Sequence, residues 1–276
     1  MAKKKTKGQV SIGFIAMMVC AGFLFVHNYL FYPVKNVPQT EGTREITIEK
    51  GEIPTLQTDR KEQIIYHEGY TVSYNSDYKI ANWVAYELTA EEANSKQVKR
   101  SDNFIPDPTV AQNETATNED YKQSGYDKGH LAPAGDMKWS VNAMRESFYF
   151  TNICPQNKGL NTGIWNVLEN QCRKWAARHG ALLIVTGPVI EDSLKQLGIH
   201  HVGIPNAFYK VICIPSGDKP KGIGFLFENK NYVKTSIRSM AVSIDRVEQM
   251  TGIDFFPSFP LEVQEEMETS SDWEYE

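Results

Sequence analysis

The sequence is poor in cysteine, and no cysteine or histidine spacing in it would hold zinc. Its four cysteines stand at positions 20, 154, 172 and 213, and no two of them form a C-x-x-C pair. Three of them lie outside the N-terminal hydrophobic run and leave two arrangements open. Either one disulfide forms and one thiol is left over, or three buried thiols pack as small hydrophobic side chains. We favour three thiols.

Basic residues are absent from the end of the chain, where no lysine or arginine follows Arg246. The formal net charge is -5, whereas the central region is close to neutral. Only the placement of the central cations can decide whether phosphate binds, so net charge neither supports nor excludes it. With 41% hydrophobic and 23% charged residues over 276 positions, the chain can bury a core and has a globular composition.

Acids are absent from residues 1–9, which carry four lysines. From residue 10 to residue 26 the chain is almost purely apolar, and aromatic residues follow up to residue 32. About 17–25 apolar residues span a bilayer, and lysines before such a run predict a cytoplasmic N-terminus. We therefore predict a cytoplasmic basic tail over 1–9 and a single-pass transmembrane anchor over 10–32 in the cell membrane. The rest of the chain would then be periplasmic or extracellular.

A cleaved signal peptide is the main alternative, because it too places lysines before an apolar run, and it would give a secreted protein. No clean small-x-small cleavage site follows the run. Arginine is absent before Arg44, which argues against an arginine-rich mitochondrial transit peptide.

Composition divides the remaining chain into three parts. Residues 33–61 mix proline, glycine, threonine and acids with little periodicity, which predicts a linker. Residues 62–258 show the hydrophobic patterning of one folded domain, and residues 259–276 form an acidic tail. No internal repeat is present.

Short apolar or β-branched runs predict strands on both sides of one clear helix. That helix covers 165–178, and Gly180 stands where a C-terminal cap is expected. A second helix is expected at 242–250. The expected strands are 63–66, 70–74, 81–88, 181–187, 207–214 and 222–227. Without regular βαβ alternation, this order predicts an α+β fold with a mainly antiparallel sheet flanked by helices.

Between residues 127 and 173 the chain gathers polar groups that can do chemistry. His130 follows Asp-Lys-Gly, and we attribute an unusual backbone angle to Gly129. An unperturbed histidine has a pKa of about 6.5, which suits a general base. The alternative is a polar turn between two strands.

Asn161 and Glu169 stand at the start of the predicted helix and near its middle. Mg²⁺ prefers oxygen ligands, keeps several waters and needs only one or two protein ligands. An amide oxygen from Asn161, with Glu169 holding metal-bound waters, would satisfy it. The alternatives are an N-cap for Asn161 and an i,i+4 ion pair between Glu169 and Arg173.

Cations and carboxamides complete this set. Lys128 and Arg100 are candidate phosphate clamps, with solvated surface charges as the alternative. Asn152 and Gln156 are candidate site groups or turn formers. A base, a metal site and cations for the phosphate are what a metal-assisted phosphodiester hydrolase needs.

The same residues resemble a known family. The motif reads D-K-G-H-L-A-P from residue 127, N-x-x-P-Q from residue 152 and N-x-x-x-W-x-x-L-E-x-x-x-R from residue 161. Further matches are N-W-V-A-Y from residue 82, T-G-P from residue 186, I-P-x-A-F-Y-K-V from residue 204 and T-G-x-D-F-F-P from residue 251. This compound motif closely resembles the sugar-non-specific DNA/RNA endonucleases, which include endonuclease G and secreted bacterial nucleases, over about residues 62–257.

The resemblance implies a ββα-metal active site and a metal-dependent endonuclease that cuts DNA and/or RNA with little sequence preference. His130 would activate water, and Asn161 would bind Mg²⁺ directly, with Mn²⁺ as a substitute. Glu169 would hold the water shell of the metal. Arg173 and Arg100 would neutralise the phosphate, and the metal would stabilise the leaving 3′ oxygen, so that products carry 5′ phosphates.

Lys128 stands where the family usually has arginine. A lysine keeps the charge but loses the bidentate fork, so we expect a functional site with altered efficiency. Asp127, Asn152 and Gln156 would be supporting residues. The expected partners are DNA and/or RNA, the membrane through the N-terminal helix, and a second copy of the chain in a homodimer. A nucleic-acid-binding or assembly protein that keeps the fold without turnover is the alternative function.

Overall fold

The computed structural model describes residues 50–215, 219–269 and 273. The predicted basic tail, the predicted anchor and most of the predicted linker lie outside the described residues. Within the described part of the chain, no helix is both long and apolar enough to cross a bilayer.

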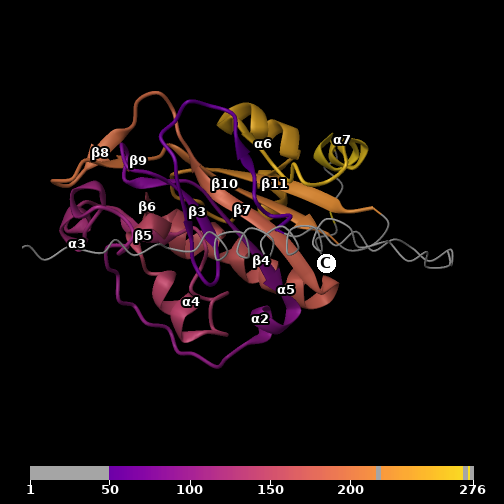
Figure 1. The fold of residues 1–276 in the computed structure, drawn as a ribbon, viewed down its shortest axis with the longest axis horizontal. Coiled ribbons are helices and arrows are strands. Elements are labelled where there is room, and N and C mark those ends of the chain that lie inside the picture. Colours follow the sequence, from indigo (N-terminus) through magenta and orange to yellow (C-terminus); the bar gives the residue numbers. More distant parts are fainter. Residues whose placement is uncertain (1–49, 216–218, 270–272, 274–276) are drawn as a thin grey trace, which may run out of the picture. The chain divides into compact units, whose positions relative to one another are not determined.

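A seven-stranded sheet forms the centre of the fold (Figure 1). Every neighbouring pair of strands in it is antiparallel, and all strands predicted from the sequence are present. The order across the sheet is β12 (Ala241–Val242), β11 (Lys221–Glu228), β10 (Ala207–Ile214), β7 (Ala181–Val189), β4 (Ile80–Thr89), β3 (Thr71–Asn75) and β2 (Gln63–Tyr66). The predicted antiparallel α+β arrangement is therefore confirmed for the described residues.

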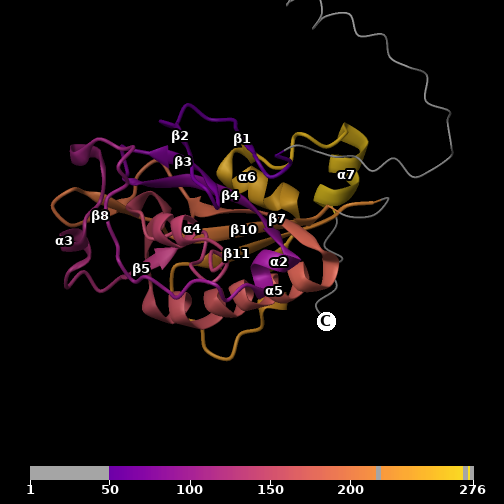
Figure 2. The same cartoon turned by 60° about the horizontal axis from the view of Figure 1, so that its bottom comes forward.

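Helices cover both faces of this sheet, α5 (Asn166–His179) on one and α6 (Ile244–Thr251) with α7 (Leu261–Thr269) on the other (Figures 1 and 2). Successive side chains of a strand point to opposite faces, so each strand contributes to two cores. On β10, Phe208 and Ile212 belong to the core that α5 covers. Val211 and Cys213 belong to the core that α6 and α7 cover.

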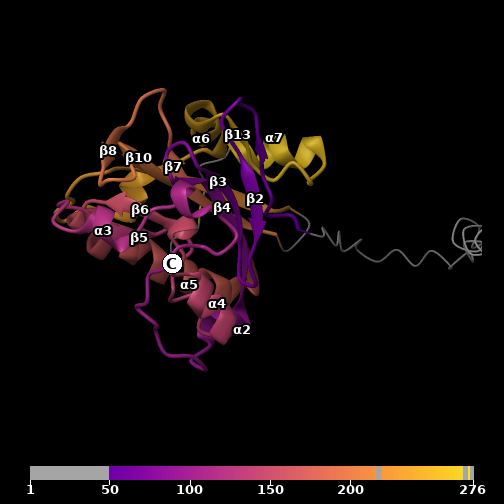
Figure 3. The same cartoon turned by 60° about the vertical axis from the view of Figure 1, so that its left-hand side comes forward.

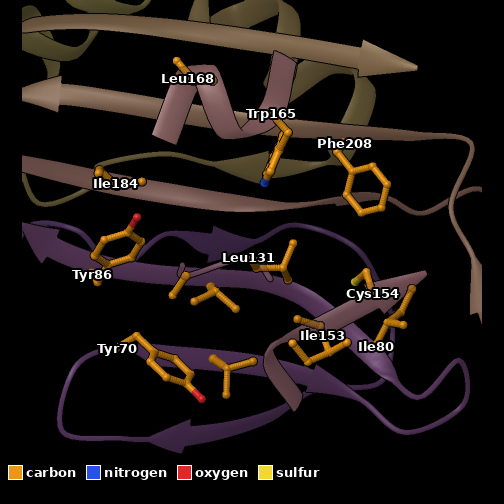
Figure 4. Close-up of a cluster of buried hydrophobic side chains, with 14 of the residues drawn as sticks. Tyr70, Ile80, Tyr86, Leu131, Ile153, Cys154, Trp165, Leu168, Ile184 and Phe208 are labelled. Carbon is orange, nitrogen blue, oxygen red and sulfur yellow. The ribbon is translucent and has the colours of Figure 1, made fainter. Parts of the chain in front are cut away.

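Helix α5 forms where the apolar spacing predicts it. Its buried residues are Leu168, Cys172, Trp175 and Ala176. Figure 4 shows Trp165, just before the helix, and Leu168 in the same cluster as Phe208 and Ile184. Burying one large apolar side chain contributes roughly 1.5–3 kcal/mol, so this stripe fixes α5 on the sheet. Gly180 ends the helix at φ 93°, a backbone angle that glycine adopts readily.

The remaining elements are short. The strands among them form the pairs β1–β13, β5–β6 and β8–β9, and β5 and β6 are found beside the main sheet in Figure 3. Their bounds are β1 (Thr55–Leu56), β5 (Asp127–His130), β6 (Ile153–Gln156), β8 (Lys195–Leu197), β9 (Val202–Ile204), β13 (Ile253–Asp254), α2 (Ala90–Asn94), α3 (Asn118–Tyr121), α4 (Val141–Glu146), η1 (Gln112–Glu114), η2 (Phe150–Asn152), η3 (Leu160–Trp165) and η4 (Ile237–Met240).

The folded domain extends beyond the boundaries expected at residues 62 and 258. Strand β1 lies within the expected linker, pairs with β13, and is followed by Arg60, which donates a hydrogen bond to the Thr251 carbonyl. Helix α7 lies within the expected acidic tail and buries Met267. Trp273 packs edge-to-face on Trp175 with 5.2 Å between ring centroids. A few anchoring apolar residues thus dock segments whose average composition is polar.

Cys154, Cys172 and Cys213 are buried free thiols. The favoured arrangement of three thiols is therefore the observed one. Burial raises the pKa of Cys172 to about 12, so this thiol stays protonated and packs as a small apolar group.

Candidate active site

Two short strands and the start of α5 bring the predicted residues together. Strands β5 and β6 pair antiparallel, with Asp127 opposite Gln156 and His130 opposite Ile153. After β6 the chain turns through η3 directly into α5. This strand–strand–helix unit lies on the face of the sheet that α5 covers (Figure 2), and it has the ββα order that the family resemblance implies.

A cleft of about 350 Å³ opens in this unit. It is lined by every residue to which the sequence analysis gives a catalytic or metal-binding role, namely Arg100, Lys128, His130, Asn161, Glu169 and Arg173. The supporting residues Asp127, Asn152 and Gln156 do not line the cleft. Asp127 bonds to Asn161, and the other two contact the chain on either side of His130. The proposed base and the proposed metal ligand therefore face one common space.

His130 ends β5 with its ring almost fully buried. The residue is 7% exposed, and its Nε2 has no hydrogen-bond partner in the part of the chain that the structure describes. Burial, and then the charge of Arg100, lower the pKa of His130 to about 3, with partial opposition from Asp102. The ring is therefore neutral at neutral pH, which is the state in which it can accept a proton.

Gly129 is required by a close approach and not by the unusual backbone angle that we predicted. It lies in β5 and is not among the glycines with positive φ. A Cβ at this position would lie 2.1 Å from Oε1 of Gln156, closer than real Cβ contacts come. Gln156 is fully buried, so it supports the site by packing against the strand that carries His130.

Asn152 fixes the chain immediately after His130. Its side-chain oxygen accepts a hydrogen bond from the Ala132 N–H at 2.9 Å. Its side-chain nitrogen donates to the carbonyls of Ala132 and Ser147, each at 2.8 Å. Because all three bonds are buried, Asn152 holds the loop that follows β5 in one conformation.

Asn161 is not the N-cap of α5. It lies in η3, a helical segment that is kinked at Gly163 before α5 begins. Its Nδ2 donates to Oδ2 of Asp127 at 3.0 Å, which gives Asp127 its supporting role. No residue that the structure describes donates to Oδ1 of Asn161, so this oxygen is available to a ligand.

Glu169 and Arg173 do not form the i,i+4 ion pair that was the alternative interpretation. Arg173 instead pairs with the buried Asp136 through Nη1 and donates from Nη2 to Asn170 at 2.8 Å. Burial lowers the pKa of Arg173, but the charge of Asp136 and its hydrogen bond oppose this, and the pKa is raised above its usual value. Glu169 makes no hydrogen bond or ion pair with any described residue, and burial raises its pKa to about 7.

Arg100 and Lys128 reach the cleft from the loop after α2 and from β5. Arg100 Nε donates to Oδ1 of Asp102 at 2.5 Å, and Lys128 Nζ donates to Oδ1 of Asn118 at 2.7 Å. Burial lowers the pKa of Lys128. Both cations therefore line the cleft while each is held by a neighbouring side-chain oxygen.

Sequence reasoning missed two buried charged residues behind the cleft, Asp136 and Lys210. Lys210 on β10 is fully buried, donates to the Leu131 carbonyl at 3.4 Å and lies 4.9 Å from the ring centroid of Trp165. Burial lowers the pKa of Lys210, and nearby acids including Glu169 oppose this shift. The available signal was a lysine inside an otherwise apolar strand, because lysine is almost never buried without a partner.

The donor groups of the cleft fit a hard divalent cation. Oδ1 of Asn161 and the carboxylate of Glu169 both line the cleft, and neither has a partner within the described residues. Oxygen donors in this small number suit Mg²⁺, which keeps most of its waters. Glu169 can then act through those waters.

A separate acidic group lies on α6 and α7, across the sheet from α5. Ligand atoms of Asp245, Glu248 and Glu268 lie within 4.8 Å of one another. Asp245 stands in the first turn of α6, where the helix dipole favours a carboxylate. Glu248 accepts a hydrogen bond from the Phe255 N–H at 2.8 Å. Because a backbone N–H satisfies Glu248 and the start of the helix favours Asp245, we assign no metal to this group.

The fold and the cleft define a mixed α/β protein whose site combines a neutral histidine, oxygen donors and cations, the groups that phosphate-ester hydrolysis needs. Residues 49–262 match the profile of the DNA/RNA non-specific endonucleases. The chain belongs to this family, which confirms the resemblance seen in the sequence.

Mitochondrial and fungal nucleases are among the similar proteins. The mitochondrial nuclease EXOG of Danio rerio is 36% identical over 211 residues, which are 70% of this chain and 60% of that protein. Nuclease C1 of Cunninghamella echinulata var. echinulata is 33% identical over 203 residues, 68% of this chain and 81% of that protein.

A solved structure of an EndoG/EndoGI complex, which addresses the mechanism of EndoG inhibition, has a similar fold. Its TM-score is 0.70 at 30% identity, covering 80% of this chain and 95% of that chain. The present chain spans 60–62% of the length of the EXOG relatives from Danio rerio, Mus musculus and Xenopus laevis.

Proposed function

We propose that this chain is a metal-dependent endonuclease that hydrolyses phosphodiester bonds of DNA and/or RNA with little sequence preference. The observation that carries the proposal is the single cleft lined by His130, Asn161, Glu169 and three cationic side chains. Membership of the DNA/RNA non-specific endonuclease family supports it. Contacts to phosphates carry no direct sequence information, which is the expected origin of the low preference.

His130 would take the proton of the attacking water. Its Nε2 is buried and has no hydrogen-bond partner among the described residues, whereas Nδ1 is not fully buried. Neither nitrogen makes a hydrogen bond to a described residue. We therefore assign the accepting lone pair to Nδ1 and the ring hydrogen to Nε2.

Asn161 and Glu169 would hold the divalent cation, which would be Mg²⁺ or, as a substitute, Mn²⁺. Because Asp127 accepts a hydrogen bond from Nδ2 of Asn161, it would keep Oδ1 of Asn161 turned away from the Asp127 carboxylate. When bound, the ion supplies a Lewis acid that stabilises charge on the leaving 3′ oxygen, so that products carry 5′ phosphates. Arg173, which Asp136 holds in place, and Arg100 would neutralise the charge of the phosphate in the transition state.

The test of the proposed function is a cleavage assay with supercoiled plasmid, single-stranded DNA and RNA side by side. We expect nicking of the plasmid with Mg²⁺, its loss with EDTA and its return when Mg²⁺ is restored. Cleavage that is insensitive to EDTA would contradict the metal. Binding to plasmid without any cleavage would contradict the enzyme and favour the non-catalytic binding protein.

Mg²⁺ should bind more weakly at pH 6 than at pH 8. The pKa of Glu169 is raised to about 7, so the carboxyl is mostly protonated at the lower pH and mostly ionised at the higher. Since a protonated carboxyl holds metal-bound waters less well than a carboxylate does, the Kd should fall by roughly tenfold over this range. Calorimetry without nucleic acid measures it. Glu169→Gln should bind weakly and with no such pH dependence, and an equal Kd for the unaltered protein at both pH values would contradict the role of Glu169.

We also propose that residues 10–32 anchor the chain in the cell membrane and place the nuclease domain outside the cytoplasm. The support is the apolar run behind four lysines. Fractionation of cells that express the full chain tests it, because a secreted product would be found in the medium and not with the membrane. The homodimer stays a prediction, which sedimentation of the full chain in detergent would test.

A further inference from the structure

Two phenylalanines that the sequence analysis did not single out pack against the ring of His130. Phe148 is fully buried and meets His130 edge-to-face, with ring centroids 4.9 Å apart and an interplanar angle of 89°. Phe104 lies 5.4 Å from His130 and 5.0 Å from Phe148 in an edge-to-face contact. The three rings therefore contact one another pairwise, in arrangements that aromatic side chains favour.

The backbone keeps the two phenylalanines together although they are far apart in the sequence. Ile105 forms an isolated bridge with Tyr149. The Ile105 N–H donates to the Phe148 carbonyl at 3.3 Å, and the Phe150 N–H donates to the Ile105 carbonyl at 3.1 Å. The loop after Arg100 is thus tied to the segment before β6, which sets Phe104 beside Phe148.

One cation of the cleft lies over the ring of each phenylalanine. Lys128 Nζ lies 4.2 Å from the ring centroid of Phe104, and Arg100 Cζ lies 5.0 Å from that of Phe148. Both distances are within the range in which a cation is attracted to a ring face. Ring and cation positions are therefore linked to the position of the base.

We propose that Phe104 and Phe148 are positioning residues that pack together on the His130 ring and set the two cations, Lys128 on Phe104 and Arg100 on Phe148, beside it. The inference rests on the proposed function of this cleft. It also accounts for Lys128 in place of arginine. A lysine ammonium is a point charge on a flexible stem, and here the ring of Phe104 and Oδ1 of Asn118 hold it from two directions.

Filling of the hydrophobic core is the competing explanation of Phe104, and Phe150 provides the matched control for it. Phe150 belongs to the same group of rings, 6.4 Å from Phe104 and stacked on Tyr121 at 5.8 Å. Within the described residues it has no ring contact with His130 and lies under no cation. Replacing Phe150 by leucine removes the same atoms from the same cluster without touching the base or Lys128.

A double-mutant cycle separates the two explanations. The variants are Lys128→Met, Phe104→Leu and Phe150→Leu, alone and with each phenylalanine change combined with Lys128→Met, and the measured quantity is kcat/KM on a duplex substrate. We expect the double variant of Phe104→Leu with Lys128→Met to lose about 3–10-fold less kcat/KM than the product of the two single losses, which is the size of a cation–ring contact. The effects of Phe150→Leu and Lys128→Met should multiply. Phe104→Tyr, which keeps the ring face, should retain the coupling to Lys128.

The same cycle measured on duplex affinity, without metal and without turnover, distinguishes failure of this inference from failure of the proposed function. Coupling in affinity without any cleavage would support the inferred ring–cation contacts and contradict the proposed nuclease activity. Cleavage in which the Phe104 and Lys128 effects multiply, as those of Phe150 and Lys128 do, would overturn the inference and leave the nuclease intact. Melting temperatures of all variants show that each is folded, and if Phe104→Leu does not fold, Phe104→Met takes its place in the cycle.

Discussion

Replacing His130 by alanine should lower kcat by about 10²–10⁴-fold, which is the usual contribution of general acid–base catalysis. The reason is that His130 lines the cleft with Asn161 and Glu169 and is the proton acceptor that we propose. Burial keeps its pKa at about 3, so no loss of activity from its protonation is expected between pH 5 and pH 8. Steady-state kinetics on duplex DNA with saturating Mg²⁺ measures the effect.

The control for this variant is His201→Ala, because His201 is an exposed histidine between β8 and β9. It should keep the kcat of the unaltered protein. Mg²⁺ binding by His130→Ala, measured by calorimetry, should be unchanged, since Asn161 and Glu169, the groups that we propose hold the metal, are untouched. Retention of more than a tenth of the activity by His130→Ala would show that another group accepts the proton, and a parallel loss of Mg²⁺ binding would show that the substitution damages the site as a whole.

The main sheet and α5 were predictable because their hydrophobic periodicity is local. Strand β10 is apolar except for Lys210, helix α5 carries an apolar stripe, and a glycine at position 180 marks the helix end. The ends of the domain were harder to place. Strand β1 is too short to carry a pattern, and α7 is polar on average, so both depend on partners that are distant in the sequence.

Apart from Arg100, the cleft residues to which we gave a catalytic or metal-binding role were predictable as a set because they belong to one compound motif. The groups behind them were not, since each acts through a neighbour that no sequence spacing reveals. Asp136 reads as a polar loop residue, and its role follows from the partner it finds in Arg173. Phe104 reads as part of an irregular loop, and it reaches His130 through the bridge of Ile105 with Tyr149. We correctly expected Gly129 to matter for the site, but the reason that we gave was wrong. Glycine is needed there because Gln156 fills the space that a side chain would occupy.

The ion pair between Asp136 and Arg173 gives the largest stability effect that we expect. Asp136 is fully buried and also accepts a hydrogen bond from the Tyr86 hydroxyl at 3.0 Å. Replacing Arg173 by methionine leaves this carboxylate without its cation, and removing one partner of a buried pair costs about 3–5 kcal/mol. For a domain of this size the melting temperature should fall by roughly 10 °C at pH 8.

The loss should be smaller at pH 5 than at pH 8. Burial already raises the pKa of Asp136 above its usual value, and Arg173 opposes that shift, so Arg173→Met raises the pKa further. A carboxyl whose pKa is higher in the folded than in the unfolded state favours folding at low pH, and this contribution is lost as pH rises through the folded-state pKa. As the pH falls, a larger fraction of the folded variant holds a neutral carboxyl and less charge has to be buried, so the destabilisation shrinks toward low pH.

Two further variants test this account of the pair by chemical denaturation at both pH values. Asp136→Asn combined with Arg173→Met removes the titrating group, so it should recover stability at pH 8 relative to Arg173→Met and lose the pH dependence. Lys174→Met removes an exposed cation from the neighbouring position of α5 and should change stability by at most about 0.5 kcal/mol. Equal destabilisation by Arg173→Met at pH 5 and pH 8 would mean that packing of the arginine side chain, and not its charge, stabilises this side of the cleft.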